Sequence, residues 1–213
     1  MRVLYEFPTS VFSRRTRLAL AHKGLEVERR DARADEKILA EARKLSPLAT
    51  FPVLDDQRRV VGDSTAIAIY LDLAYPDLPL LWPRGKDAAH VAVSITSQVD
   101  VAMNTLADVG TRYWPLRNDP AWDGVVREKM ARAQAAIDCV AAEATRPILA
   151  GDTWSVADIW ALSATLWIQG MPPRASTSPL VAQILTLGFK LPEALVRWAK
   201  QHEDRADVRA IYG

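Results

Sequence analysis

The chain has 213 residues, of which 49% are hydrophobic and 25% are charged, and its formal net charge is +1. A nearly neutral chain has no strong field to attract nucleic acid or an anionic membrane, so we expect partners of neither kind. The length suits two small domains with two hydrophobic cores. No apolar stretch of signal-peptide length follows MRVLYEF, and no long uncharged apolar run occurs, so we expect neither export nor a membrane span.

A single cysteine, Cys139, is present, so no disulfide can form within the chain. The three histidines, His22, His90 and His202, are far apart in the sequence and show none of the spacings typical of metal ligands. We therefore expect a reducing, cytoplasmic setting and no metal. Cys139 itself is expected to be a small buried apolar residue, because free cysteine behaves as one.

The first part of the chain alternates strand patterns with helix patterns. Apolar runs bounded by turn signals indicate strands, and apolar residues three or four positions apart indicate helices. In chain order these patterns predict a buried strand at 2–7, a helix at 10–24 that stops at Gly24, a strand at 25–30, a helix carrying Ile38, Ala42 and Leu45 that ends before Pro47, a hairpin at 51–62, and a helix that Ser64 opens. The order is βαβ followed by ββα.

The rest of the chain has a helical period throughout. Apolar stripes at 92–106 and 126–140 predict two long packed helices, and WSVADI carries a capping box of Ser155 and Asp158. A last helix is expected to begin at Pro192. Because prolines cluster just before the first long helix, we expect a first domain at 1–76, a linker at 77–85 and an all-helical domain at 86–213.

Four stretches resemble cytosolic glutathione S-transferases, and the resemblance covers nearly the whole chain: LYEFPTSVFSRRTRLALAHKG, SPLATFPVL, VVGDSTAIAIYL and GDTWSVADIW. It implies an α/β plus all-α fold, with a thioredoxin-like N-terminal domain (βαβ-ββα) followed by an all-helical C-terminal domain. The first stretch most resembles the serine-type branch, which includes the zeta class and bacterial members. The tyrosine-type branch would place its hydroxyl at Glu6, so that branch does not fit.

Ser10 is the position on which the family's serine falls. It stands at the start of a predicted helix, where the helix dipole and a hydroxyl donor favour a thiolate over a thiol. The resemblance implies that Ser10 holds the sulfur of glutathione as the attacking anion. A serine before a helix can equally be an ordinary N-cap, so both interpretations stay open. Thr9 and Ser13 are the reserve hydroxyls.

Phe51 and Pro52 form the second candidate part of the glutathione site. A proline donates no hydrogen bond, so in a strand it is confined to the first residue or an edge. The main chain of Phe51 can then pair with an extended tripeptide, and the family's cis peptide at Pro52 turns these groups toward glutathione. A proline that merely starts a strand is the alternative. Thr50 replaces a longer polar side chain common in the family, which weakens the expected binding.

Asp63 and Ser64 form the third part. A helix N-terminus attracts anions, so the hydroxyl and amide of Ser64 suit a carboxylate, and Asp63 suits an ammonium group beside it. These are the charges of a γ-glutamyl head. Plain capping by Ser64 is the alternative.

The second substrate is expected to be a small apolar electrophile. Its pocket is predicted to contain Phe12, Met103, Ala107, Tyr113 and Trp114, with core packing as the alternative for each. Phe12 stands two residues after Ser10, where the zeta class has cysteine, and this disfavours the thiol-oxidoreductase branches.

Three arginines, Arg14, Arg15 and Arg17, follow the candidate serine. We expect them to form a solvated face, with neutralisation of a substrate anion as the alternative.

The resemblance implies a cytoplasmic, homodimeric glutathione S-transferase, with glutathione as co-substrate, that conjugates the glutathione thiolate to a small hydrophobic electrophile. Two alternatives remain. One is a glutathione-dependent isomerase of the zeta (maleylacetoacetate isomerase) kind, and the other is a non-catalytic module that binds ligands or proteins.

Overall fold

A computed structural model describes residues 1–46 and 50–212. Its first part has the expected element order, with β1 (Arg2–Glu6), α1 (Val11–His22), β2 (Glu28–Asp31), α2 (Glu36–Leu45), β3 (Val53–Asp56), β4 (Arg59–Gly62) and α3 (Ser64–Ala74). The helix expected to stop before Pro47 ends at Leu45, and Pro47 itself lies outside the described residues.

The four strands form one mixed sheet in the order β2-β1-β3-β4. Strands β1 and β2 are parallel and are joined by the crossover helix α1, whereas β3 is antiparallel to both β1 and β4. The second strand begins at Glu28 rather than Leu25, because its pairing with β1 starts at the Val3–Glu28 pair.

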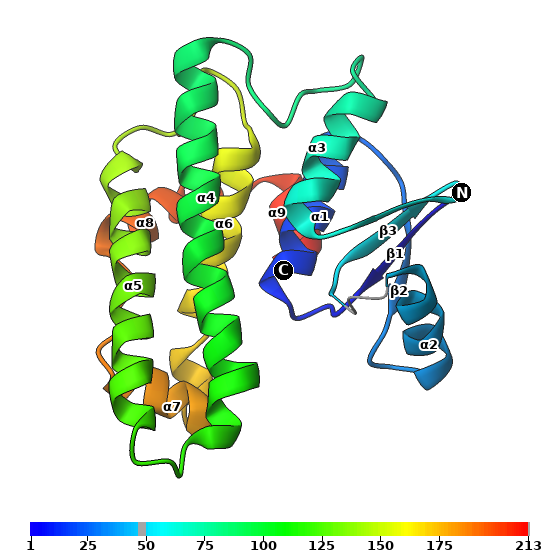
Figure 1. Cartoon of the computed structure of the whole chain (residues 1–213). Coiled ribbons are helices and arrows are strands. Elements are labelled where there is room, and N and C mark those ends of the chain that lie inside the picture. Colours follow the sequence, from blue (N-terminus) through cyan, green and yellow to red (C-terminus); the bar gives the residue numbers. More distant parts are fainter. Residues whose placement is uncertain (47–49, 213) are drawn as a thin grey trace.

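The two faces of the sheet bury different residues, since successive side chains of a strand point to opposite sides. Leu4 and Leu54 pack with Leu18 of α1 and Ile67 of α3. On the other face, Val3, Tyr5 and Val53 pack with Ala42 of α2. Helices α1 and α3 therefore lie between the sheet and the helical part of the molecule, while α2 lies on the far side (Figure 1).

The helical part follows an irregular stretch at residues 75–85. Its elements are α4 (Lys86–Asp108), the π-helix η1 (Val109–Tyr113), the 3₁₀ helix η2 (Trp114–Leu116), α5 (Trp122–Glu143), α6 (Val156–Gln169), the 3₁₀ helix η3 (Pro172–Arg174), α7 (Pro179–Thr186), α8 (Glu193–Lys200) and α9 (Ala206–Tyr212). Helices α4, α5 and α6 run side by side (Figure 1). The expected capping box at Ser155 and Asp158 opens α6.

Three expectations from the sequence are wrong. The helix at Pro192 is not the last, because α9 follows it and packs against α1. One large core extends through both parts, with Leu18 and Ile67 in the same cluster as Val99 and Trp160, so the cores are not divided between the parts. Cys139 is exposed.

The exposure of Cys139 follows from the geometry of its helix. Ala136, Ile137 and Val140 are buried, and they form the apolar stripe of α5 that faces the core. Cys139 lies off that stripe, so its position outweighs the usual preference of cysteine for burial.

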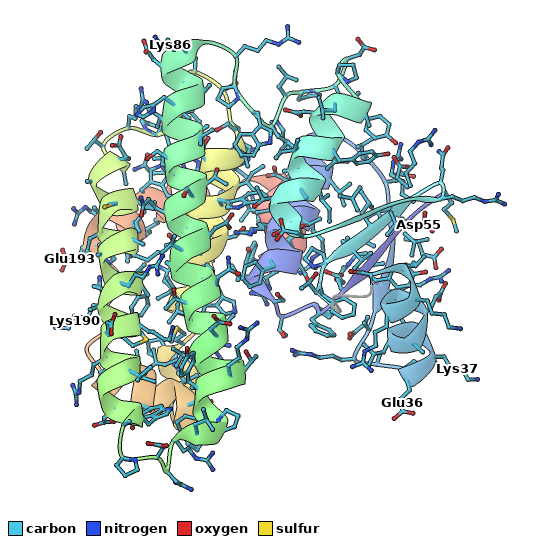
Figure 2. The ribbon with its side chains drawn as sticks, in the orientation of Figure 1. Glu36, Lys37, Asp55, Lys86, Lys190 and Glu193 are labelled. Carbon is cyan, nitrogen blue, oxygen red and sulfur yellow. The ribbon has the colours of Figure 1, made fainter. Side chains whose placement is uncertain are left out.

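Charged side chains occupy the outer surface of both parts. Figure 2 labels examples at the periphery of the molecule, namely Glu36, Lys37, Asp55, Lys86, Lys190 and Glu193. Among the helices of the described residues, none combines the length and apolar character that crossing a membrane requires.

Candidate functional site

A cavity of about 600 Å³ lies between the sheet part and the helical part. Segments distant in the sequence form its wall, among them the start of α1, the loop before β3, the start of α3, the end of α4 and the end of α6. Among the residues predicted from the sequence, those that line it are Ser10, Phe12, Thr50, Phe51, Asp63, Ser64, Met103 and Ala107.

Ser10 occupies the N-cap position of α1, with extended backbone angles (φ −71°, ψ 134°), but its side chain makes no capping hydrogen bond. The hydroxyl is half-buried at the cavity wall. A serine whose hydroxyl caps the helix would accept from the N–H two or three residues on. The geometry therefore leaves the Ser10 hydroxyl free to bind a group in the cavity.

The two reserve hydroxyls differ from Ser10. Ser13 is fully buried, and its oxygen accepts a hydrogen bond from the backbone N–H of Phe7 at 3.3 Å. It is absent from the cavity wall. Thr9 is exposed and does line the cavity. Of the two, only Thr9 can reach a bound ligand.

Asp63, and not Ser64, is the N-cap of α3. Its carboxylate accepts hydrogen bonds from the backbone N–H groups of Thr65 at 2.8 Å and Ala66 at 3.0 Å. Its φ of 73° lies in the left-handed region, which aspartate tolerates better than most residues. Asp63 also lines the cavity, so one negative charge lies beside the N-terminus of α3 at the cavity wall.

Ser64 is the first residue of α3, and its hydroxyl accepts hydrogen bonds from the buried side chain of Arg15. The guanidinium donates to the hydroxyl oxygen through Nε at 2.9 Å and Nη2 at 2.7 Å. A hydroxyl oxygen has two acceptor positions and one O–H donor. With both acceptor positions used, the remaining function of the Ser64 hydroxyl is to donate, which suits an anionic ligand.

The third nitrogen of Arg15 forms an ion pair with Asp100 of α4, with Nη1 and Oδ1 2.6 Å apart. The guanidinium also lies over the ring of Trp160 on α6, 4.4 Å from its centroid. Burial lowers the pKa of Arg15, and the negative charge of Asp100 opposes that effect. Arg15 therefore connects α1 and α3 with α4 and α6 of the helical part.

The expected solvated face of arginines is wrong for Arg15 and Arg17, of which only 1% and 9% are exposed. Arg17 pairs with the buried carboxylate of Glu6, with Nε and Oε2 3.3 Å apart. The burial of these two arginines results from tertiary packing. Helices α6 and α9 pack against this side of α1, and the periodicity of α1 alone does not reveal them.

The peptide bond between Phe51 and Pro52 is cis, as the resemblance implies. Phe51 precedes the first pair of the β1–β3 ladder, Tyr5 with Val53, so its main chain lies outside the ladder. Its ring packs on that of Phe7, with centroids 4.3 Å apart. Pro52 is buried and does not itself line the cavity.

Tyr113 and Trp114 do not line the cavity, which corrects two residues of the predicted electrophile pocket. Tyr113 accepts a hydrogen bond from the indole of Trp122 at its carbonyl, and the ring of Trp114 packs edge-on against Trp122. Thr111, within the π-helix at Val109–Tyr113, lines the cavity, and it follows Met103 and Ala107 at intervals of four residues.

Sequence reasoning missed several other wall residues: Phe7, Val11, Arg33, Asn104, Trp167 and Arg174. Arg33 lies in the turn after β2, with its guanidinium 4.3 Å from the ring centroid of Phe7. Trp167 and Arg174 come from the end of α6 and from η3. No periodic signal singles out such loop and helix-end positions. Within the described residues, no group of three or more acidic, histidine or cysteine side chains is arranged to hold a metal ion.

Comparison with known proteins shows what the sheet part is similar to. Residues 4–79 match the family model described as glutathione S-transferase, N-terminal domain. The chain is 35% identical over 122 residues to a probable glutathione S-transferase, GSTU1, of rice (Oryza sativa subsp. japonica), a match that covers 55% of this chain and 53% of the rice protein. It spans about half the length of that relative.

Two further proteins extend the likeness. Glutathione S-transferase Z1 of Arabidopsis thaliana is 40% identical over 83 residues, which cover 38% of this chain and 37% of that protein. The crystal structure of rice GST1 in complex with glutathione superimposes with a TM-score of 0.69 at 26% identity, and the match covers all of this chain and 90% of the rice chain. The fold expected from the sequence is thereby confirmed.

Proposed function

We propose that this chain is a glutathione S-transferase that binds glutathione and transfers the glutathione thiolate to an electrophile, because residues 4–79 match the N-terminal domain of that family. The observation that carries the proposal is the position of Ser10. Its hydroxyl makes no capping bond, and it lines the same cavity as the α3 N-terminus.

Glutathione carries charges that match the sheet side of the cavity. The ammonium of its γ-glutamyl head fits beside Asp63, and the adjacent carboxylate accepts from the hydroxyl of Ser64 and the N-terminus of α3. The cysteinyl main chain pairs with the main chain of Phe51, beside Thr50. Arg33 is suited to the glycyl carboxylate, because it is a cavity-lining cation without an ion-pair partner among the described residues.

The chemical step needs the sulfur as an anion, because the thiolate is the nucleophile. A hydrogen bond donated by Ser10, at the positive end of α1, stabilises the thiolate and lowers the pKa of the bound thiol. The thiol proton passes to solvent. The sulfur then forms a bond to the electrophilic carbon, and either a leaving group departs or the electrophile's double bond takes up a proton.

The second substrate occupies the helical side of the cavity. Phe12, Met103 and Ala107 line the cavity and would supply an apolar wall for it. Rice GST1 was crystallised with glutathione, which supports the assignment of the co-substrate.

Glutathione binding and turnover test the proposal together. Millimolar glutathione should raise the melting temperature, because a ligand of the folded state adds RT ln(1 + [L]/Kd) to its stability. Turnover of a generic aryl halide supports the transferase, whereas turnover only of a cis-configured dienoic acid would favour the isomerase. Glutathione binding without turnover of either would favour the non-catalytic module, and no binding would refute the proposal.

A homodimer in the cytoplasm is part of the same proposal. Large apolar side chains are exposed on neighbouring elements, namely Ile69 and Leu73 of α3 and Val93 of α4. Such residues are suited to an isologous contact between two copies. A reducing compartment keeps glutathione in the thiol form that a detoxifying transferase needs. Sedimentation as a monomer at micromolar concentration would refute the dimer.

A further inference from the structure

The helical side of the cavity carries one positive charge that the proposed glutathione site does not use. Among the charged residues of the cavity wall, Asp63 and Arg33 match glutathione, and Arg174 remains. Arg174 lies in η3, and it is exposed.

The guanidinium of Arg174 is held in place by the end of α6. Its Nε donates to the carbonyl of Gly170 at 2.7 Å, and Nη2 donates to the carbonyl of Trp167 at 3.4 Å. The group also lies over the ring of Trp167, 5.1 Å from the centroid. These contacts fix one edge of the fork, while Nη1 has no hydrogen-bond partner among the described residues. A fixed guanidinium with free N–H groups is suited to bind a planar oxyanion.

A second arginine adds to the positive charge at this place. Although the residue as a whole is exposed, partial desolvation of the Arg174 guanidinium lowers its pKa, and the positive charge of nearby Arg14 lowers that pKa further. Within residues 1–46 and 50–212, neither guanidinium has a carboxylate within ion-pair distance. Two like charges without a counterion are unfavourable, and a bound anion would relieve the repulsion.

The same wall offers an apolar surface. Met103, Phe12 and Trp167 line the cavity together with Arg174. We propose that the electrophile carries a carboxylate on an aromatic or apolar body, with Arg174 binding the carboxylate and Trp167 forming part of the wall along the body. This inference rests on the proposed transferase function and narrows its second substrate from a neutral apolar compound to an organic acid.

A matched pair of electrophiles tests it, namely 4-chloro-3-nitrobenzoate and its neutral amide, 4-chloro-3-nitrobenzamide. In both, the thiolate sulfur bonds to the carbon that carries chlorine, and chloride leaves with the bonding electrons. Each kcat/KM is divided by the rate of the uncatalysed reaction, which corrects for intrinsic reactivity. The wild-type protein should then prefer the benzoate.

Arg174→Gln should lower kcat/KM for the benzoate about 10- to 100-fold, because a hydrogen bond to a charged group is worth about 1.5–3 kcal/mol. It should change the value for the amide less than about threefold. Arg117→Gln is the control, because Arg117 likewise lies over a tryptophan ring, that of Trp114, and donates to a backbone carbonyl, but lies outside the cavity wall. It should change neither value.

If Arg174 merely caps α6, the substitution will lower the melting temperature and affect both electrophiles equally, and the inference is then wrong. A wild-type protein without preference for the benzoate would also overturn it. Glutathione should raise the melting temperature of Arg174→Gln as it does that of the wild type, which shows that the glutathione site is intact.

The binding of the two reaction products gives a second readout that does not depend on turnover. S-(4-carboxy-2-nitrophenyl)glutathione should bind the wild type more tightly than its carboxamide, and Arg174→Gln should abolish that difference. Equal binding of the two products by the wild type would overturn the inference while leaving the transferase intact. Failure of glutathione itself to bind would overturn both.

Discussion

The guanidinium of Arg15 donates two hydrogen bonds to the hydroxyl oxygen of Ser64, which lies 49 positions further along the chain. The same guanidinium pairs with Asp100. One buried side chain thus connects the start of α3, where we place the γ-glutamyl carboxylate, with the helical part of the molecule. Substitutions in this cluster should affect stability and glutathione binding together.

Arg15→Gln should lower the free energy of unfolding by about 3–5 kcal/mol, because it leaves Asp100 without its cation in a partly buried position. It should also weaken glutathione binding, since Ser64 loses the donors that orient its hydroxyl. Urea unfolding and calorimetric titration measure the two effects. The matched control is Arg112→Gln, which breaks an exposed pair with Asp108 and should cost less than about 1 kcal/mol. Equal losses in the two variants would contradict the structural role of Arg15.

Ser10→Ala separates helix capping from thiolate stabilisation. Because the Ser10 hydroxyl makes no capping bond, the variant should lose less than about 0.5 kcal/mol of stability. The pKa of bound glutathione should rise by about one to two units, since a charge-assisted hydrogen bond is worth about 1.5–3 kcal/mol. Turnover near neutral pH should fall about 10- to 100-fold and partly recover at alkaline pH.

The thiolate absorbance of bound glutathione, titrated in both proteins, reads this pKa directly. Ser155→Ala serves as the capping control, because Ser155 belongs to the capping box of α6 and should cost about 0.5–2 kcal/mol without changing the pKa of the bound thiol. Equal titration midpoints for wild type and Ser10→Ala would show that Ser10 does not stabilise the thiolate. Thr9, whose hydroxyl-bearing side chain also belongs to a residue of the cavity wall, would then be the next candidate.

Asp63→Asn tests the ammonium contact while preserving the cap of α3. Asparagine is an equally good N-cap and tolerates a positive φ, so stability should change by less than about 0.5 kcal/mol. Most of the glutathione-induced stabilisation, about 1.4 kcal/mol at ten times Kd, should disappear. Asp63→Ala is the less informative variant, because it also removes the bonds to Thr65 and Ala66.

Thermal denaturation with and without glutathione measures the glutathione-induced stabilisation of Asp63→Asn and of the wild type. Asp35→Asn is the control, because Asp35 caps α2 in the same way through the backbone N–H of Lys37 but lies outside the cavity wall. A full glutathione shift in Asp63→Asn would show that the ammonium is held elsewhere.

His202 should make the protein less stable in mild acid. Burial lowers the pKa of His202, and the hydrogen bond between its Nε2 and the carbonyl of Pro147 opposes this only in part. The folded state therefore binds fewer protons than the unfolded state below about pH 6.5, so stability is complete above that pH and falls as the pH drops toward the folded pKa. The fall is at most about 1.4 kcal/mol per pH unit.

Urea unfolding at pH 5, 6 and 7 measures this dependence. His202→Gln should show a shallower decline than the wild type. Some decline should remain, because burial also lowers the pKa of His22. Parallel curves for the two proteins would refute the contribution of His202.

Cys139 should react in the folded protein without loss of function. It is exposed on α5 and does not line the candidate cavity. Iodoacetamide should therefore modify the thiol without denaturant, and turnover of an aryl halide should persist. Cys139→Ser should change stability by no more than about 0.5 kcal/mol. Inactivation on alkylation that Cys139→Ser prevents would place this thiol in the mechanism.

The sequence alone determined the local structure of the chain and the chemical identity of the residues that form the proposed glutathione side of the cavity. Apolar periods and turn residues are properties of short segments, so the βαβ-ββα order, the start of α3 at Ser64 and the capping box at Ser155 could be predicted. Ser10, Phe51 and Asp63 lie at ends of such elements. Their positions follow from the order of the elements together with the family resemblance.

Tertiary packing decided which groups each side chain contacts at the cavity and which side chains reach the cavity wall. Arg15 has the sequence context of a solvated arginine, yet α6 and α4 cover it, so it binds Ser64 and Asp100. Tyr113 lies outside the cavity wall, whereas Arg174 of η3, far along the chain, is part of it. How deeply a side chain is buried, and which charges lie near it, depends on which distant segments of the chain pack together. The periodicity of a single segment does not contain that information.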